Sequence, residues 1–533
     1  MESGDPGHAK FALTGRVVTM NDSFLVLPRG TVYIQGDSVA AVQDATQPPP
    51  AGFAAIVPED TGGTIYPGLI ELHNHLSYNA LRLWSVPKKY GDRSQWAGTP
   101  QYQQLITEPM KILGTSPGLL PAVVRFVECK CLVAGVTTSQ GIQLFSNAGV
   151  RRYYQGTLRV AEAPGDPALP PAATRIADVA ATDRDAFLKE LGTRQCFLLH
   201  LSEGTDDAAR AHFTSLQAPD GSWAIRDSLA GIHCVALRQQ DWQVMASHGA
   251  SMIWSPMSNL LLYGGTADVA AAKAAGIRIG MGSDWAPSGS KNLLGELKVA
   301  RIFAQEMALG ISDRDLVAMA TRDAAAILRW QGGLGTVEPG KHADLVVIDG
   351  VQSDAYSCLL AATETSISLV VVNGLPRFGR RPLMQALGAQ GETMVVGGQQ
   401  RMLGLKPTIE DPAIAEVGLA EATARLTDAL SRLPELAHAQ TLLSSPAVGE
   451  QTQSTQSTQW YLALDELTDT GVDLRPSLTD EMNARPQIAA APLPVHALRL
   501  DTLTVVDDAD FFDRLGAETN LPHFLVPALK AMY

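Results

Sequence analysis

Two histidines stand one residue apart, directly after a short apolar run. His73 and His75 follow the segment Gly68-Leu69-Ile70-Glu71-Leu72, whose composition predicts a strand. Because residues i and i+2 of a strand point to the same face, both imidazoles can aim at one point. Imidazole is a common neutral ligand of zinc and iron, so the pair supplies half of a metal site if further ligands lie nearby. The alternative is a pair of hydrogen-bonded core histidines.

Four more polar residues follow predicted strands farther along the chain. His200 ends "QCFLLH" and Glu203 comes three residues later, whereas His233 ends "AGIH" and Asp284 ends "IRIGMGSD". In a barrel of parallel strands, residues at the carboxyl ends of the strands meet at one mouth. Three neutral histidines and one carboxylate then make an open metal site with room for water, as in catalytic zinc sites. Taken singly, each residue also has a structural interpretation, as a core histidine or a turn carboxylate.

The elements that must position these residues fall into four stretches. Residues 67–332 alternate apolar strands with longer helical segments, which is the length and rhythm of a (β/α)8 barrel. Short β-like runs in residues 1–66 and 333–400 predict one small β-sandwich domain built from both sides of the barrel. Residues 401–533 form an α+β extension of unknown role. The expected fold class is α/β: a TIM barrel with a composite β-sandwich domain and a C-terminal extension.

The extension contains three recognisable segments. "DPAIAEVGLAEATARLTDALSRLPEL" predicts an amphipathic helix opened by Asp411 and Pro412, and "VHALRLDTLTVVDD" predicts a strand. "QTQSTQSTQ", Gln451 to Gln459, is typical of a polar linker. The helix and the final strand are candidates for a dimer contact, so a homo-oligomer is a possible assembly.

Composition limits the partners. The 533 residues are 46% apolar and 18% charged, and the formal net charge is -14. An acidic surface without a dense basic block disfavours nucleic acid and anionic membranes, so a small-molecule substrate is expected. The beginning of the chain lacks the signature of a signal peptide, and no run of about 20 apolar residues occurs, which together favour a cytoplasmic protein.

The cysteines favour the same compartment. Five scattered cysteines are typical of reduced thiols rather than of a disulfide framework. Cys129 and Cys131 lie in a segment with helical spacing, where packing is a better interpretation than metal binding.

Several motifs occur together in a known order. They are "PGLIELHNHL", "VAGVTTSQG", "LLHLSEG", "GIHCVAL", "SPMSNLLLYGG", "GMGSDWAPSG" and "LGTVEPGKHADLVVID". With these motifs the sequence resembles the metal-dependent amidohydrolase superfamily over about residues 9–400, in particular its branch of chlorotriazine hydrolases and cytosine, guanine and S-adenosylhomocysteine-type deaminases.

The resemblance implies a metal centre. It assigns one divalent metal ion to four ligands, namely His73, His75, His200 and Asp284. Zinc is the first choice, with iron or manganese also suited to these ligands. Relatives with two metal ions use a carboxylated lysine, and the corresponding region, "TRIADVAATDRDAFL", contains none. A single ion is therefore expected.

The expected activity is hydrolysis of a non-peptide carbon–nitrogen bond in a small cyclic amidine or amide, with deamination as the leading interpretation. A metal-bound hydroxide would attack the ring carbon, because the metal lowers the pKa of its water to about 7. Asp284 would accept the proton of the water, Glu203 would pass a proton to the leaving amine, and His233 would hydrogen-bond the oxyanion. The alternatives are ring opening, decarboxylation or a biosynthetic cyclisation, and a non-catalytic scaffold.

The substrate contacts depart from the patterns of these relatives. Trp254 stands where many relatives carry a histidine before Pro-x-Ser-Asn; it would either stack on a flat ring or fill the barrel wall. The loop after the first strand carries Trp84, Tyr90 and Trp96 among basic residues, and is either a binding loop or a packed lid surface. Trp84, Trp254 and Asn259 are the candidate substrate contacts.

Overall fold

The fold is built on parallel strands that alternate with helices. The computed structural model describes residues 10–116, 118–146, 149–351, 354–405, 412–444, 460–464 and 494–533. Five parallel strands form one sheet in the order β10 (Ala173–Arg175), β11 (Phe197–Leu201), β12 (Leu229–His233), β13 (Ser251–Trp254) and β14 (Arg278–Met281). Three further parallel strands form a second sheet: β5 (Leu69–Ile70), β6 (Val136–Ser139) and β9 (Arg159–Val160). Helices join β5 to β6 and each successive pair of strands from β10 to β14, whereas no described helix lies between β6 and β10.

Backbone hydrogen bonds link the two parallel sheets at both of their edges. The amide of Ala172, before β10, donates to the carbonyl of Ala161, after β9. At the other edge the amide of Leu72 donates to the carbonyl of Met281 in β14. One buried apolar cluster takes residues from six of these eight strands or from positions next to them: Ile70, Leu72, Ala161, Ala172, Cys196, Leu198, Ala230, Ile232 and Ile253. These six strands therefore contribute side chains to one shared core.

Helices accompany these strands along the chain. Those between β10 and β14 are α4 (Arg184–Leu191), α5 (Asp207–Thr214), α6 (Gln239–Ser247), α7 (Pro256–Tyr263) and α8 (Val269–Ala274). Those after β14 are α9 (Leu293–Glu306), α10 (Asp313–Met319) and α11 (Arg322–Ile327). Those before β6 are α1 (Pro100–Tyr102), α2 (Glu108–Thr115) and α3 (Leu119–Leu132). Cys129 and Cys131 are buried thiols of α3, in agreement with a packing role.

A separate sheet combines the two segments that flank the parallel strands. Its nine strands are ordered β18-β19-β17-β16-β15-β4-β1-β2-β3, and β4 of the first segment pairs with β15 of the second. The first segment supplies β1 (Lys10–Val18), β2 (Val26–Gln35), β3 (Ser38–Asp44) and β4 (Glu59–Pro67). The second supplies β15 (Leu345–Asp349), β16 (Ile367–Val372), β17 (Leu375–Arg380), β18 (Glu392–Val396) and β19 (Gln399–Leu403), with the helices α12 (Ala355–Ala361) and α13 (Arg381–Ala386).

The extension differs from its prediction in two respects. The predicted helix is three helices, α14 (Pro412–Ala415), α15 (Leu419–Ser431) and α16 (Leu433–Ser444), and the buried face of α15 packs against α3 of the same chain. The predicted strand in 495–508 is wrong, because this segment runs as irregular chain held by side-chain contacts. The buried face of α15 and the segment predicted as a final strand thus do not support the expected dimer contact. The predicted linker, Gln451 to Gln459, lies outside the described residues.

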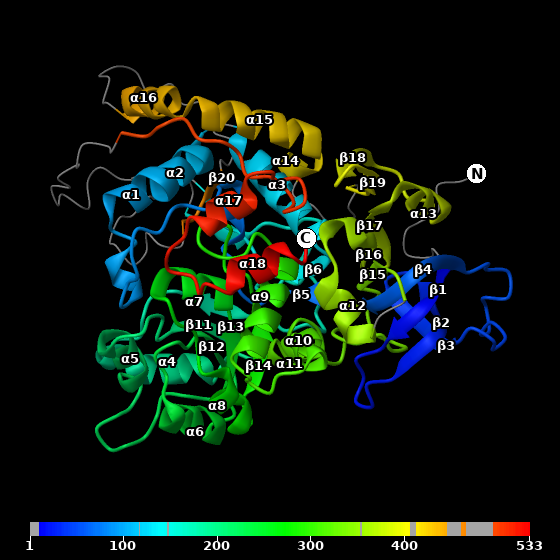
Figure 1. The fold of residues 1–533 in the computed structure, drawn as a ribbon, viewed down its shortest axis with the longest axis horizontal. Coiled ribbons are helices and arrows are strands. Elements are labelled where there is room, and N and C mark those ends of the chain that lie inside the picture. Colours follow the sequence, from blue (N-terminus) through cyan, green and yellow to red (C-terminus); the bar gives the residue numbers. More distant parts are fainter. Residues whose placement is uncertain are drawn as a thin grey trace.

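The last described segment returns to the helices that accompany the parallel strands. It carries α17 (Phe511–Gly516) and α18 (Leu525–Lys530), and α18 packs on α9 (Figure 1, red). A short strand of the extension, β20 (Trp460–Leu462), pairs with β7 (Gln143–Ser146), which in turn pairs with β8 (Arg151–Tyr153). Within the described ranges no single helix has the length and hydropathy of a membrane span; α1 to α3 meet that criterion only as a sharply bent pair.

Candidate metal centre and adjoining cavity

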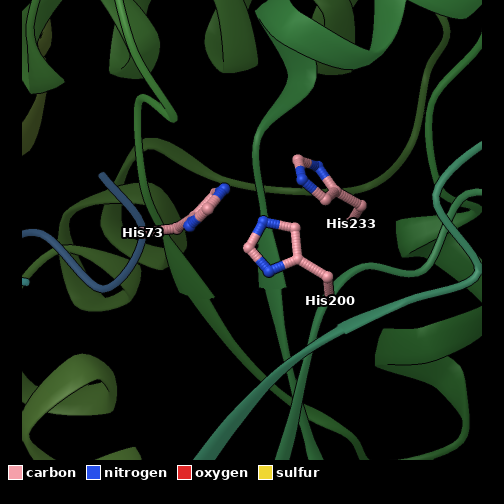
Figure 2. Close-up of side chains that lie close together, drawn as sticks. All are labelled: His73, His200 and His233. Carbon is pink, nitrogen blue, oxygen red and sulfur yellow. The ribbon is translucent and has the colours of Figure 1, made fainter. Parts of the chain in front are cut away.

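Three histidines, His73 after β5, His200 in β11 and His233 in β12, converge at one point. The ring centroid of His73 lies 4.7 Å from that of His200 and 5.0 Å from that of His233, and the last two are 5.3 Å apart. Figure 2 shows the three rings turned toward a common centre. All three are buried.

His233 owes its direction to an unusual backbone conformation. Ile232 packs in the apolar cluster that the strands share, so the next residue of a regular strand would point the other way. His233 instead has a φ of 67°, in the left-handed region, and Asp284 has a φ of 66°. Such conformations are costly for residues other than glycine and gather at functional sites. Here they accompany side chains that point to the shared centre.

A second group of candidate ligands shares His73. The Oδ1 atom of Asp284 lies 3.1 Å from Nε2 of His73 and 3.5 Å from Nε2 of His75. Ligands about 2.0–2.1 Å from a tetrahedral zinc ion are about 3.3 Å from one another. The spacing of these three atoms therefore suits a shared ion.

The hydrogen bonding of the site fits a metal. Within the part of the chain that the structure describes, Nε2 of His73 and Nδ1 of His200 are buried without a hydrogen-bond partner, although Nε2 of His73 is close to Asp284. A short contact without hydrogen-bond geometry is what two ligands of one cation make. The other ring nitrogen of His73, Nδ1, lies 3.1 Å from Oε1 of Gln140. This contact fixes the orientation of the ring, as the hydrogen-bond partners of metal-bound histidines do.

The surroundings of His233 separate it from this ligand set. The indole N–H of Trp254 donates to Thr266 (2.8 Å), whose hydroxyl donates to Oδ1 of Asn259 (3.2 Å). The amide nitrogen of Asn259 must then donate to Nδ1 of His233, at 2.9 Å. The remaining proton of a neutral imidazole sits on Nε2, which lies 3.7 Å from Oε2 of Glu203. His233 is therefore arranged to donate a hydrogen bond rather than to bind a cation.

Burial sets the charge states of the site. It holds the pKa of His200 and that of His233 well below the ordinary value, with further lowering by nearby histidines, so both imidazoles are neutral. Burial alone raises the pKa of Asp284, but His73 and the other histidines outweigh it and hold the pKa below its ordinary value. A neutral imidazole at His200 and a carboxylate at Asp284 are suitable ligands for a divalent ion.

Glu203 is held ready to carry a proton. Burial, aided by the charge of Asp284, raises the pKa of this carboxyl. The hydroxyl of Tyr263 donates to Oε1 of Glu203 at 2.7 Å and accepts from the indole of Trp96 at 2.9 Å. These contacts leave Oε2 directed toward His233. A carboxyl with a raised pKa at a cavity wall is suited to general acid and base chemistry.

A cavity of about 600 Å³ opens over these groups, a size that suits a small organic molecule. Its wall includes four of the predicted residues at the centre, His75, His200, His233 and Asp284, together with Glu203, Arg93, Trp96 and Trp285. Trp84 and Trp254 are buried and are not among the described residues of its wall. Asn259 contacts His233 from behind rather than the cavity.

Sequence reasoning missed several contributors. Gln140 follows strand β6 directly, so the rule that selected the strand-end histidines also applies to it. Trp96 and Arg93 lie in the loop after the first strand, for which the sequence supports either a binding or a packing role. Both residues line the cavity. Tyr263 ends α7, where nothing in the sequence marks it as a partner of Glu203.

The carboxyl of Glu296, on α9 behind the site, yields a pH prediction. Burial raises its pKa from 4.5 to about 8, although the Ser290 hydroxyl and the Met257 amide both donate to it. The stability that its proton contributes is therefore complete below pH 4.5 and is lost as the pH rises through about 8. As the pH rises between these limits, the unfolding free energy of Glu296→Gln should increase relative to that of wild type by roughly 1.4 kcal/mol per pH unit.

Thermal unfolding midpoints at pH 5.5 and 8 measure this effect. The control is Glu306→Gln, at the exposed end of the same helix. This variant should change the unfolding midpoint by the same amount at both pH values. A Glu296→Gln difference that does not change with pH contradicts the assignment.

The chain is similar in sequence to known proteins. A model of the amidohydrolase family matches residues 200–376. A 5-methylthioadenosine/S-adenosylhomocysteine deaminase of Symbiobacterium thermophilum is 33% identical over 161 residues, 28% of this chain and 37% of that protein. The same-named protein of Moorella thermoacetica is 24% identical over 397 residues, 66% of this chain and 90% of that protein.

Solved structures support the fold. Atrazine chlorohydrolase from Arthrobacter aurescens, complexed with zinc, superposes with a TM-score of 0.53 at 19% identity, covering 78% of this chain and 100% of that one. The chain spans about a third of the length of the curated relatives that it matches at 30% identity or more.

Proposed function

We propose, from the premise that the chain belongs to the amidohydrolase superfamily, that it hydrolyses a carbon–nitrogen bond of a small cyclic amidine and releases ammonia. The single observation that carries this proposal is the arrangement of Glu203 and the neutral His233 beside a group of candidate metal ligands in one cavity. Relatives with the name of deaminase, among them the proteins of Symbiobacterium and Moorella, support the choice of reaction.

We infer that the eight parallel strands close into a (β/α)8 barrel over residues 67–332. The hydrogen bonds between the two parallel sheets at both edges, and the core that the strands share, support this assignment. Residues 1–66 and 333–400 form one composite β domain in this view, since β4 and β15 are paired. The candidate ligands then lie at the carboxyl ends of barrel strands, where active sites of this fold are found.

The metal site consists of His73, His75, His200 and Asp284, and it holds one divalent ion, with zinc as first choice. The polarity of the hydrogen bonds around His233 favours this set over one that includes His233. When bound, the ion lowers the pKa of water to about 7 and so supplies hydroxide at neutral pH.

The chain's own residues divide the remaining work. Asp284, a carboxylate at neutral pH, accepts the proton of the attacking water. Glu203 delivers its proton to the ring nitrogen, takes up the remaining proton of the added water and passes it to the departing amine, after which the proton held by Asp284 returns to Glu203. Tyr263 holds the Glu203 carboxyl in place. His233 donates from Nε2 to the atom on which negative charge develops. Trp96 and Trp285 offer flat surfaces in the cavity wall for a planar ring.

Ammonia release from a panel of aminated purines, pyrimidines, triazines and imidazoles tests the proposal. The protein is used with its metal site filled, and the expected result is ammonia formed in equal amount to the substrate consumed. Consumption of a ring substrate without ammonia would replace deamination by ring opening. No turnover on any member, with one ion bound per chain, would contradict the proposed reaction.

A further inference from the structure

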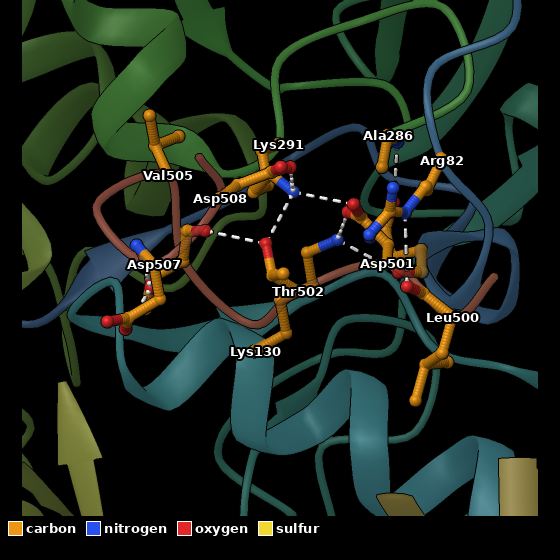
Figure 3. A network of polar contacts seen from close by, with 12 residues as sticks. Arg82, Lys130, Ala286, Lys291, Leu500, Asp501, Thr502, Val505, Asp507 and Asp508 are labelled. Carbon is orange, nitrogen blue, oxygen red and sulfur yellow. Dashed lines mark hydrogen bonds and ion pairs between the residues drawn. The ribbon is translucent and has the colours of Figure 1, made fainter. Parts of the chain in front are cut away.

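The C-terminal segment carries a buried carboxylate that lies against the loop of the candidate metal ligands. Asp501 is almost completely buried, and it contacts two lysines that are equally buried. Its Oδ2 atom accepts from Nζ of Lys130 on α3 at 2.5 Å, and its Oδ1 atom accepts from Nζ of Lys291 at 2.6 Å. Figure 3 shows these contacts at the centre of a larger polar network.

A second carboxylate, Asp508, lies at the far side of the network. It accepts from Lys291 at 2.9 Å and from Arg514 at 2.6 Å. Lys291 also donates to Thr502 at 3.0 Å. Among the contacts described for Asp508, none reaches Lys130, so the two carboxylates share one lysine but face different parts of the protein.

Lys130 continues the path toward the ligand loop. Besides Asp501, its Nζ donates to the carbonyl of Asn79 at 2.9 Å. The amide of Asp501 donates to the carbonyl of Ala80 at 3.0 Å, and Arg82 donates to the carbonyl of Leu500 at 3.2 Å. The short helix η2 (Leu76–Ala80), which follows His75 directly, is thus fixed at its end by the C-terminal segment.

Asn79 passes this restraint to both halves of the candidate metal centre. Its Oδ1 accepts from the amide of Ala286, two residues after Asp284, at 2.7 Å. Its Nδ2 donates at 2.9 Å to Oδ1 of Asn74, the residue between His73 and His75 in the sequence. Asn74 in turn donates through its backbone amide to Oε1 of Gln140, the same atom that contacts His73.

We propose that Asp501 is a positioning residue for the metal centre, acting through Lys130 and Asn79 on the loops that carry the ligands. The proposal rests on the metal site of the proposed function, and it gives the extension a role. Partners of metal ligands typically alter metal affinity by 10- to 100-fold when they are lost. Asp501 lies one step farther away, so an effect near the lower limit is expected.

Two matched variants of the full-length chain separate positioning from general stability. Asp501→Asn and Asp508→Asn each remove one buried carboxylate from the same lysine network, and both should lower the thermal unfolding midpoint. Zinc affinity is measured by competition with a chelating dye. The expected result is an affinity about 10-fold weaker in Asp501→Asn and within 2-fold of wild type in Asp508→Asn.

The outcomes distinguish the two proposals. Equal zinc affinity in Asp501→Asn and wild type, or an equal loss in both variants, overturns the positioning role. A wild-type chain that binds no zinc contradicts the metal site of the proposed function instead. If Asp501→Asn does not fold, the double variant Lys130→Met with Asp501→Leu removes both charges and still deprives Asn79 of its donor. It should bind zinc about 10-fold more weakly, and wild-type affinity in it overturns the proposal.

Discussion

Replacing Asp284 by asparagine should lower kcat/KM for ammonia release by at least about 1,000-fold while the fold is retained. The carboxylate lies within 3.5 Å of Nε2 of both His73 and His75, and it is the proposed acceptor of the water proton. Asparagine cannot accept that proton, and it contributes no negative charge to the ligand set. It does tolerate the left-handed backbone at this position, where φ is 66°, so the loop should keep its conformation.

Circular dichroism and the thermal midpoint verify the fold of this variant, and steady-state ammonia release measures its activity. Asp227→Asn, at an exposed carboxylate paired with Arg329, is the control and should stay within 2-fold of wild type. An Asp284→Asn protein that keeps a tenth of the wild-type rate would remove Asp284 from the mechanism.

Glu203→Gln should reduce kcat by roughly 100- to 10,000-fold without loss of the metal. Glutamine can still accept the hydrogen bond of Tyr263, which now runs at 2.7 Å to Oε1, so the local packing persists. It cannot carry a proton between the water and the leaving amine. The loss should therefore appear in kcat, with the metal content and thermal midpoint near those of wild type.

Tyr263→Phe serves as the matched variant for Glu203. It removes the hydroxyl that holds the carboxyl but leaves the carboxyl itself, so a loss of about 10-fold is expected. A Glu203→Gln variant as active as Tyr263→Phe would mean that the carboxyl positions other groups and transfers no proton.

The parts of the site that the sequence predicts share one property: they lie at or just after the carboxyl ends of strands. His200 and His233 end apolar segments that are strands β11 and β12, so their positions at one end of neighbouring strands follow from the alternation of strand and helix. The same rule selects His73, His75 and Asp284. The rule does not predict the direction in which each side chain points, because the left-handed φ of His233 and Asp284 depends on tertiary packing.

Trp254 illustrates the limit of motif reasoning. The sequence leaves open whether it stacks on a ligand or fills a wall, and the structure places its indole behind His233, where it begins the hydrogen-bond chain through Thr266. Asp501 shows a second limit. The expected strand around it satisfied the alternation of apolar residues, but contacts with Lys130 and Lys291, more than 200 residues away in sequence, determine the local conformation.

The most direct measurement is zinc content together with zinc-dependent ammonia release on one preparation. The account predicts about one ion per chain, loss of ammonia release when a chelator removes it, and recovery when zinc is added back. Ammonia release that persists at the wild-type rate in fully stripped protein would contradict the central claim that His73, His75, His200 and Asp284 form a catalytic metal site.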